Sequence, residues 1–189
     1  MKRIAILASG SGTNAENLIR FFRTHPSGRV VIVLTNRPGA GVIQRSEALH
    51  VETVVFNREQ FYESDEVIDL LKEREIDLVI LAGFLWLVPS AFIQAFSGRI
   101  INIHPALLPC YGGKGMYGSK VHEAVLASSD TESGITIHYV NQEYDEGNIV
   151  FQAKCEVRKV DTPETLADRI HQLEYEHFPV VVEKLLDQL

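Results

Sequence analysis

Three polar side chains with complementary chemistry are the most informative feature of this 189-residue sequence: the amide of Asn102, the imidazole of His104 and the carboxylate of Asp145. Asn102 and His104 close an apolar run, and residues i and i+2 of a strand face the same side. Pro105 cannot continue a central strand, so we expect the pair at a strand end. Strand ends of this kind bind ligands in α/β sheets.

These three groups suit acyl transfer. An amide N–H can stabilise the oxyanion that forms when a carbonyl is attacked, and an imidazole can accept or relay the proton of an attacking amine. A nearby carboxylate favours the imidazolium, so we expect Asp145 to raise the pKa of His104. No protein nucleophile is required if the substrate amine attacks directly. From spacing alone, the alternative that Asn102 and His104 only satisfy loop backbone groups is equally open.

A glycine-containing loop at Ser9–Asn14 separates the first expected strand from the first expected helix. Its glycines allow close backbone approach, and a helix N-terminus offers free N–H groups to a phosphate. Ala15 replaces the third glycine of a dinucleotide fingerprint, and no acidic residue follows the second strand. A phosphate monoester therefore fits better than NAD or ATP. The alternative is an ordinary tight turn.

The elements that must position these groups alternate along the chain. Apolar runs predict strands, and the segments between them predict helices. The strands are expected at 4–8, 30–35, 52–56, 78–82 and 99–103, and the helices at 14–23, 41–49, 60–74 and 89–96. This pattern predicts one α/β domain over residues 1–189, with a doubly wound, mostly parallel sheet and helices on both faces.

The pattern changes after Pro105. A glycine-rich loop at 105–120 and a short helix at 121–127 precede strands at 134–140 and 148–157, which we expect to extend the sheet antiparallel. A last helix opens at Thr162, a capping residue followed by Pro163 at the first helical position.

Composition excludes several classes of protein. The net charge of −7 argues against a nucleic-acid binder, and no apolar run reaches the roughly 18 residues of a membrane span. Cys110 and Cys155 form no CxxC pair, so we expect neither a disulfide framework nor a zinc site and place the chain in the reducing cytoplasm. His171 and His177 lack HExxH spacing, so no metal is expected.

Five segments together resemble the folate-dependent formyltransferases, and among them the phosphoribosylglycinamide formyltransferase family. The segments are 4–17, 77–84, 101–109, 134–140 and 145–152, and their most specific parts are Asn102–Pro109 and the distant Asp145-Glu146-Gly147. The resemblance covers nearly the whole chain. It implies the fold of that family, 10-formyltetrahydrofolate as co-substrate and glycinamide ribonucleotide as acceptor, in a monomer or a homodimer without nucleic-acid or membrane partners.

The resemblance also implies site residues. Asn102, His104 and Asp145 would be catalytic, and from their chemistry we expect Asn102 and a protonated His104 to stabilise the oxyanion. The ribose phosphate would be bound by Gly12, Thr13, Asn14 and His171, and the ribose hydroxyls by Glu174. The folate pocket would be lined by Phe84, Leu85, Trp86, Leu87 and Val88, with the pterin near the segment from Gln142 to Gly147.

Two positions depart from the family pattern. Trp86 stands where relatives often have an arginine able to contact the folate tail, so stacking, an apolar wall or plain packing are all open there. Cys110 stands where lysine is common. Residues 110–120 are predicted to form a mobile lid over the reacting centre, the alternative being an inert loop.

Other functions remain compatible with the sequence. A formyltransferase of the same fold could act on methionyl-tRNA or a sugar nucleotide, and a hydrolase could transfer the formyl group to water. The tRNA enzyme normally carries a further domain and a basic surface, neither of which is expected here. A non-catalytic nucleotide-binding module would explain the loop at Ser9–Asn14 but not the three polar side chains.

Overall fold

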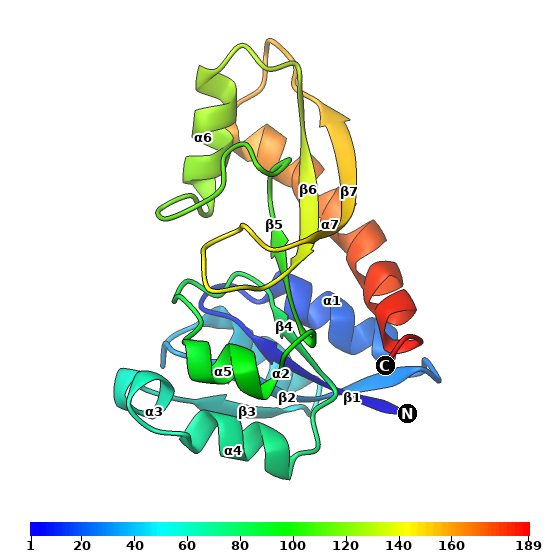
Figure 1. The fold of residues 1–189 in the computed structure, drawn as a ribbon. Helices are drawn as coiled ribbons and strands as arrows, with labels where there is room; N and C mark the ends of the chain where they lie inside the picture. The colour runs from blue at the N-terminus through cyan, green and yellow to red at the C-terminus, as the bar shows by residue number, and fades with distance from the viewer.

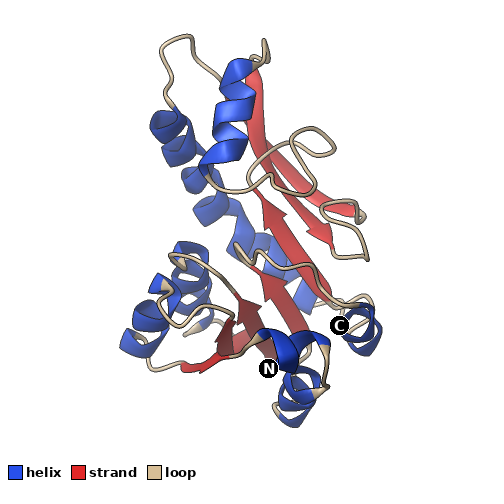
Figure 2. Cartoon of the chain, turned by 90° about the vertical axis from the view of Figure 1, so that its left-hand side faces the viewer, coloured by secondary structure: helices blue, strands red, loops and turns tan.

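The computed structural model describes all 189 residues, and a seven-stranded mixed sheet forms its centre (Figures 1 and 2). The strand order is β3-β2-β1-β4-β5-β6-β7. The strands are β1 (Lys2–Leu7), β2 (Gly28–Thr35), β3 (Glu52–Val55), β4 (Leu78–Leu81), β5 (Ile100–His104), β6 (Glu132–Tyr139) and β7 (Ile149–Glu156). The strands from β3 to β5 pair in parallel, whereas β6 pairs antiparallel with both β5 and β7. The predicted parallel sheet with antiparallel C-terminal strands is confirmed.

Helices cover both faces of the sheet. They are α1 (Thr13–Phe22), α2 (Gly41–Ala48), α3 (Arg58–Tyr62), α4 (Glu66–Glu73), α5 (Ser90–Ala95), α6 (Ser119–Ala127) and α7 (Pro163–Leu186). Ile4 and Ile6 of β1 pack into a core with α1, α2, α6 and α7, whereas Ala5 and Leu7 pack into a second core with α3, α4 and α5. This strict alternation explains why β1 is apolar from Ile4 to Leu7, since both of its faces are buried there.

The prediction of one helix over 60–74 is wrong. A capping box between Asn57 and Gln60 starts α3 early, and the chain leaves helical geometry before α4. The hydroxyl of Ser64 lies 3.4 Å from both the carbonyl oxygen of Gln60 and the backbone nitrogen of Glu66. Serine side chains compete in this way with the helical backbone bonds, so the helix is interrupted here.

The last helix begins as predicted. The side chain of Thr162 accepts from the backbone N–H of Thr165, and Pro163 occupies the first helical position. Helix α7 then runs beside α1 and α6 (Figure 1). None of the helices combines the length and apolar content that crossing a membrane demands.

Candidate active site

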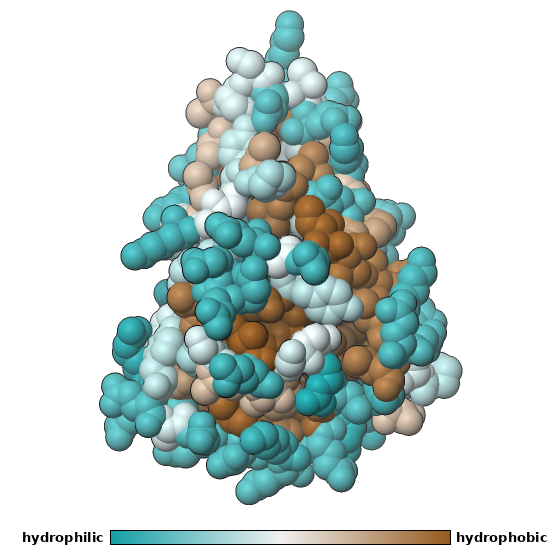
Figure 3. All heavy atoms as spheres, in the orientation of Figure 1, coloured by the Kyte–Doolittle hydropathy of each residue, from teal (hydrophilic) through white to brown (hydrophobic).

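A cavity of about 730 Å³ opens at the carboxyl ends of β1, β4 and β5. Its walls come from the loop at Ser9–Asn14, from residues 81–88, from the segment Asn102–Pro105 and from residues 113–119, and from parts of the β6–β7 connection and α7. In the orientation of Figure 1, the space-filling view shows apolar residues in the middle of the molecule's front face within a frame of hydrophilic ones (Figure 3). The position agrees with the rule that open α/β sheets bind ligands at strand ends.

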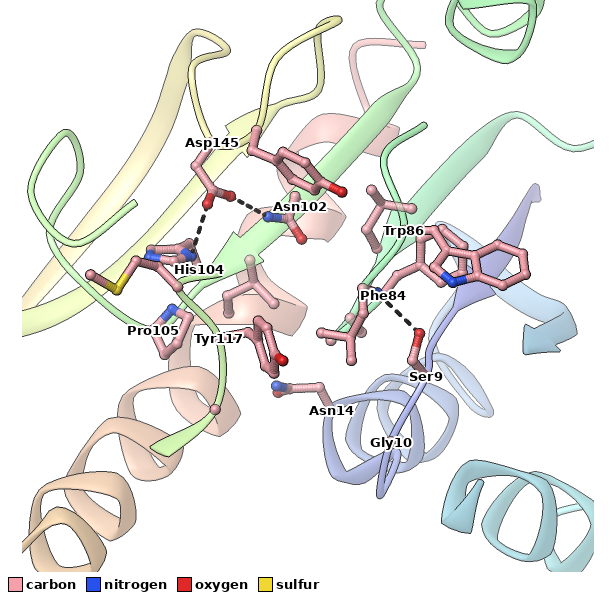
Figure 4. A pocket seen from close by; sticks show the side chains of 18 of the residues that line it. Ser9, Gly10, Asn14, Phe84, Trp86, Asn102, His104, Pro105, Tyr117 and Asp145 are labelled. Atoms are coloured by element: carbon pink, nitrogen blue, oxygen red, sulfur yellow. Dashed lines mark hydrogen bonds and ion pairs between the residues drawn. The ribbon is translucent and has the colours of Figure 1, made fainter. Parts of the chain in front are cut away.

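The three predicted catalytic side chains meet in this cavity (Figure 4). Asn102 and His104 project from β5, and Asp145 comes from the β6–β7 connection, where its backbone is left-handed at φ 58°. The Asp145 carboxylate accepts from Nδ2 of Asn102 at 3.2 Å, and its other oxygen lies 3.5 Å from Nδ1 of His104. The backbone N–H of Gly113 donates to the same carboxylate at 3.0 Å. One carboxylate thus holds both β5 side chains and the glycine-rich loop.

His138 is a fourth member of this group that the sequence-based prediction missed. It lies opposite Asn102 in the antiparallel pair of β5 and β6. Its Nδ1–H donates to the carbonyl oxygen of Tyr139 at 2.9 Å, which leaves Nε2 to accept from Nδ2 of Asn102 at 3.1 Å. The strand over 134–140 was predicted, but only the register of β5 and β6 shows that His138 faces Asn102.

Asp145 raises the pKa of His104, as expected from the sequence, but the net shift has the opposite direction. Burial lowers the pKa of His104 and outweighs the opposing effects of the Asp145 carboxylate and the Tyr111 carbonyl oxygen. Nε2 of His104 donates to that carbonyl oxygen at 2.7 Å, so the neutral ring carries its proton there. The resting site therefore contains a neutral His104 whose Nδ1 faces Asp145.

The pKa of Asp145 is shifted in the direction that keeps its carboxyl group ionised. Burial alone would raise the pKa of its carboxyl group. The neighbouring His138, the proximity of His104 and the Gly113 N–H outweigh burial, so the pKa of Asp145 lies below its ordinary value. The site thus pairs a charged carboxylate with an imidazole that lacks a proton on the facing nitrogen.

The amide of Asn102 is oriented differently from the predicted oxyanion donor. Both of its N–H bonds point at partners, one at Asp145 and one at His138. Its carbonyl oxygen is turned away from Asp145 (Figure 4). As placed, Asn102 therefore offers the cavity an acceptor rather than a donor.

The loop at Ser9–Asn14 forms one end of the cavity, together with α7. Gly12 precedes α1 in a left-handed conformation, and a Cβ there would lie 2.5 Å from Val42, so only glycine fits. Gly12, Thr13, Asn14, His171 and Glu174 all line the cavity, and so does Arg37, to which no sequence pattern pointed.

The buried side chain of Glu174 connects Asn14 with His171 at this end of the cavity. One of its oxygens accepts from Nδ2 of Asn14 at 2.8 Å and lies 2.9 Å from Nδ1 of His171. This hydrogen bond raises the pKa of His171 despite partial burial. An ionisable ring with a raised pKa beside the α1 N-terminus suits an anionic ligand. We call this end, formed by Gly12, Thr13, Asn14, His171 and Glu174, the anion corner.

Residues 84–88 form an apolar wall at the other end, and all five predicted positions line the cavity. The Trp86 ring lies 6.4 Å from that of Phe84 and also packs on Phe56, Phe61 and Tyr62. Trp86 thus both packs in the core and faces the cavity. Arg58 extends over the Trp86 ring, 5.9 Å from its centroid.

The remaining predicted positions lie elsewhere. Gln142 is exposed and Gly147 packs against β6, where a Cβ would meet the carbonyl oxygen of Tyr139. Neither lines the cavity, although Val140, Asn141, Glu143 and Tyr144 do. Cys110 is exposed and also lies outside the lining.

Comparison with known proteins identifies the relatives of this chain. The model of the formyl transferase family matches residues 2–182. The chain is 35% identical to phosphoribosylglycinamide formyltransferase of Bacillus subtilis, over 98% of this chain and 95% of that protein. It is 40% identical to the chloroplastic enzyme of that name from Arabidopsis thaliana, covering 99% of this chain but only 66% of the longer plant protein.

Solved structures agree with this relationship. The phosphoribosylglycinamide formyltransferase of Bacillus halodurans superposes with a TM-score of 0.87 at 37% identity, covering 98% of this chain and 95% of that one. Glycinamide ribonucleotide transformylase 1 of Geobacillus kaustophilus gives 0.88 at 35% identity, covering 98% and 99%. The fold, the cavity at the strand ends and these relatives lead to one conclusion: the chain belongs to the formyl transferase family.

Proposed function

We propose that this protein transfers the formyl group of 10-formyltetrahydrofolate to the amine of glycinamide ribonucleotide, a step of purine synthesis. The observation that carries the proposal is the joining of Asn102 and His104 through Asp145 in a cavity with an anion corner at one end and an apolar wall at the other. The names of the relatives supply the acceptor and the formyl group that is transferred, and the folate donor is part of this proposal. The two free cysteines fit the cytoplasm, where these substrates would be met.

In the proposed reaction, the amine lone pair attacks the formyl carbon and the carbonyl electrons move to oxygen. The amine then loses a proton, and the bond from the formyl carbon to N10 of the folate breaks with its electron pair on N10, which takes up a proton. The formyl group changes nitrogen without an acyl-enzyme, so no protein nucleophile is needed.

The side chains divide this work. The oxygen of Asn102 accepts an N–H of the attacking amine and aims its lone pair. His104 starts neutral and takes up the amine proton, directly or through water, because the oxyanion and Asp145 together favour its charged form. The imidazolium then stabilises the oxyanion and returns a proton to N10.

The two ends of the cavity place the substrates. In this proposal Gly12, Thr13, Asn14 and His171 bind the ribose phosphate and Glu174 binds the ribose hydroxyls. The folate pocket is lined by Phe84, Leu85, Trp86, Leu87 and Val88, and within it the pterin ring lies along the backbone from Val140 to Asp145. An apolar wall beside backbone amides suits a flat, polar-edged ring.

Residues 113–119 are proposed to act as a lid. They line the cavity, and the Gly113 N–H is bonded to the catalytic carboxylate, so the position of this loop is coupled to the reacting centre.

A spectrophotometric assay of tetrahydrofolate release tests the proposal. We expect release only when 10-formyltetrahydrofolate and glycinamide ribonucleotide are both present, and loss of release in Asn102→Ala. His25→Ala is the matched control, because His25 contacts Ser27 and Glu183 rather than the cavity. Release without the ribonucleotide would indicate a hydrolase instead, and binding of both substrates without release would indicate a non-catalytic module.

A further inference from the structure

His122 is a buried imidazole on the cavity wall that the proposed reaction does not use. It lies in α6, is only 4% exposed and lines the cavity. Its Nδ1 is closed off from solvent and has no hydrogen-bond partner. Such an atom loses its bonds to water and gains none in return, so the residue carries a cost in folding free energy. A polar ring kept at that cost beside a cavity points to a task for its other nitrogen, Nε2.

The unpaired Nδ1 determines which nitrogen carries the proton. An unpaired buried N–H is less tolerated than an unpaired acceptor, so the neutral ring places its proton on Nε2. Burial lowers the pKa of His122, nearby His171 and His104 lower it further, and Glu174 opposes them. His122 is thus an uncharged N–H donor near neutral pH.

Three ionisable residues lie near His122. His171 and Glu174 come from α7, and His104 comes from β5. Glu174 is bonded to Asn14 at the start of α1. His122 therefore lines the same cavity from a third helix and lies near two members of the anion corner and near His104.

We propose that His122 donates a hydrogen bond from Nε2 to the phosphate of the ribonucleotide substrate and so completes the anion corner. The inference rests on the proposed function, which supplies a phosphate-bearing substrate. A neutral donor suits this place, because it adds a hydrogen bond without setting a second positive charge beside His171. The α1 N-terminus and His171 contribute the positive potential, and His122 contributes a hydrogen bond of defined direction.

Calorimetric titration with glycinamide ribonucleotide, and with the riboside that lacks the phosphate, tests this role. We expect His122→Phe to bind the ribonucleotide about tenfold more weakly, the size of one hydrogen bond to a charged acceptor. The riboside should bind wild type and variant equally, and His122→Gln, which keeps an N–H donor, should recover part of the loss. His25→Phe is the matched control. Because the donor is neutral, the loss should be constant from pH 6.5 to 8.5.

Three results would overturn the inference: equal affinity of wild type and His122→Phe for the ribonucleotide, an equal loss for the riboside, or a loss that grows as pH falls. Wild-type protein that binds no ribonucleotide would instead refute the proposed function itself. Should His122→Phe not fold, ¹⁵N-histidine NMR of the wild type decides. We expect one buried ring with a bare Nδ1 whose Nε2–H resonance moves with ribonucleotide but not with riboside, and an unmoved resonance would refute the bond.

Discussion

The hydroxyl of Ser9 accepts the backbone N–H of Leu85 at 3.0 Å, which joins the end of β1 to the apolar wall of the cavity (Figure 4). The same hydroxyl donates to the side-chain oxygen of Asn36 at 2.7 Å. Ser9 is only 1% exposed and directly precedes the glycine loop of the anion corner. One buried side chain therefore helps to set the distance between the two ends of the cavity.

Replacing Ser9 by alanine should disturb both ends at once. Because the Leu85 N–H and the Asn36 oxygen lose their partner, we expect the free energy of unfolding to fall by about 1–3 kcal/mol. The KM values for both substrates should rise together. Urea unfolding and steady-state kinetics measure these effects, with the exposed Ser97→Ala as control. A KM change confined to one substrate would contradict the proposed link.

His138 should matter for rate rather than for substrate affinity. In His138→Leu the Asn102 amide loses an acceptor and is free to rotate, so its oxygen is no longer aimed at the amine. Misaimed groups of this kind cost roughly a hundredfold in rate, so kcat should fall tenfold to a hundredfold with little change in KM. Steady-state kinetics at saturating substrate test this. An unchanged kcat would show that the Asn102–Asp145 bond suffices.

The pH dependence of kcat/KM should reflect the lowered pKa of His104. The neutral ring is the active form, so activity should rise with pH through a value below the ordinary pKa of histidine, about 6.5. Asp145→Asn removes a charge that raises this pKa, so the acidic limb should move to lower pH while kcat falls by roughly 10²–10⁴. Profiles from pH 5 to 9 provide the measurement. A limb at the same pH in both proteins would exclude this role of Asp145.

His104 and His171 should affect stability with opposite signs. The folded pKa of His104 lies below its unfolded value, so the unfolded chain binds more protons there and stability falls as pH drops below about 6.5. The folded pKa of His171 is raised, so its contribution is present below about 6.5 and is lost as pH rises through the folded pKa. The two variants His104→Gln and His171→Gln should therefore change the difference in unfolding free energy between pH 5 and pH 8 in opposite directions, which urea unfolding at the two pH values measures. Changes of the same sign would contradict the assignment.

Asp161 should stabilise the entry to α7. Its carboxylate contacts Arg169 at 2.5 Å and accepts from the Arg158 backbone N–H, and its pKa is lowered to about 2, first by Arg169. At pH 7 we expect Asp161→Asn to lower the free energy of unfolding by about 1 kcal/mol, after allowance for solvent screening. The folded pKa is depressed, so this difference should shrink as pH falls from about 3.8 toward 2. Denaturant unfolding tests it, with exposed Asp168→Asn as control.

Much of this fold can be predicted because parallel strands that are buried on both faces consist mainly of apolar residues. Residues Ile4–Leu7 of β1 and all of β4 are apolar because helices cover both faces, and the cap at Thr162 depends only on residues within one turn. The break between α3 and α4 depends instead on how Ser64 bonds the backbone. Hydrogen bonds of that kind have no periodicity to read.

The residues of the site can also be predicted from the sequence, but the interactions that depend on packing cannot. Asn102, His104 and Asp145 can be chosen from their types and from a family resemblance. The part played by His138 depends on the register of β5 and β6, and the direction of the His104 pKa depends on burial against the charge of Asp145. Both are properties of packing, and so is the position of Gly147 against the carbonyl oxygen of Tyr139.

The hydrogen bond between Asn14 and Glu174 joins positions 160 residues apart. A chain emerging from the ribosome contains the Asn102, His104 and Asp145 side chains well before it contains α7. The anion corner then comes into being only when the last helix docks on the first. Under the proposed function, competence to hold the phosphorylated substrate coincides with completion of the fold, and a bound ribonucleotide would in turn stabilise the docking of the last helix.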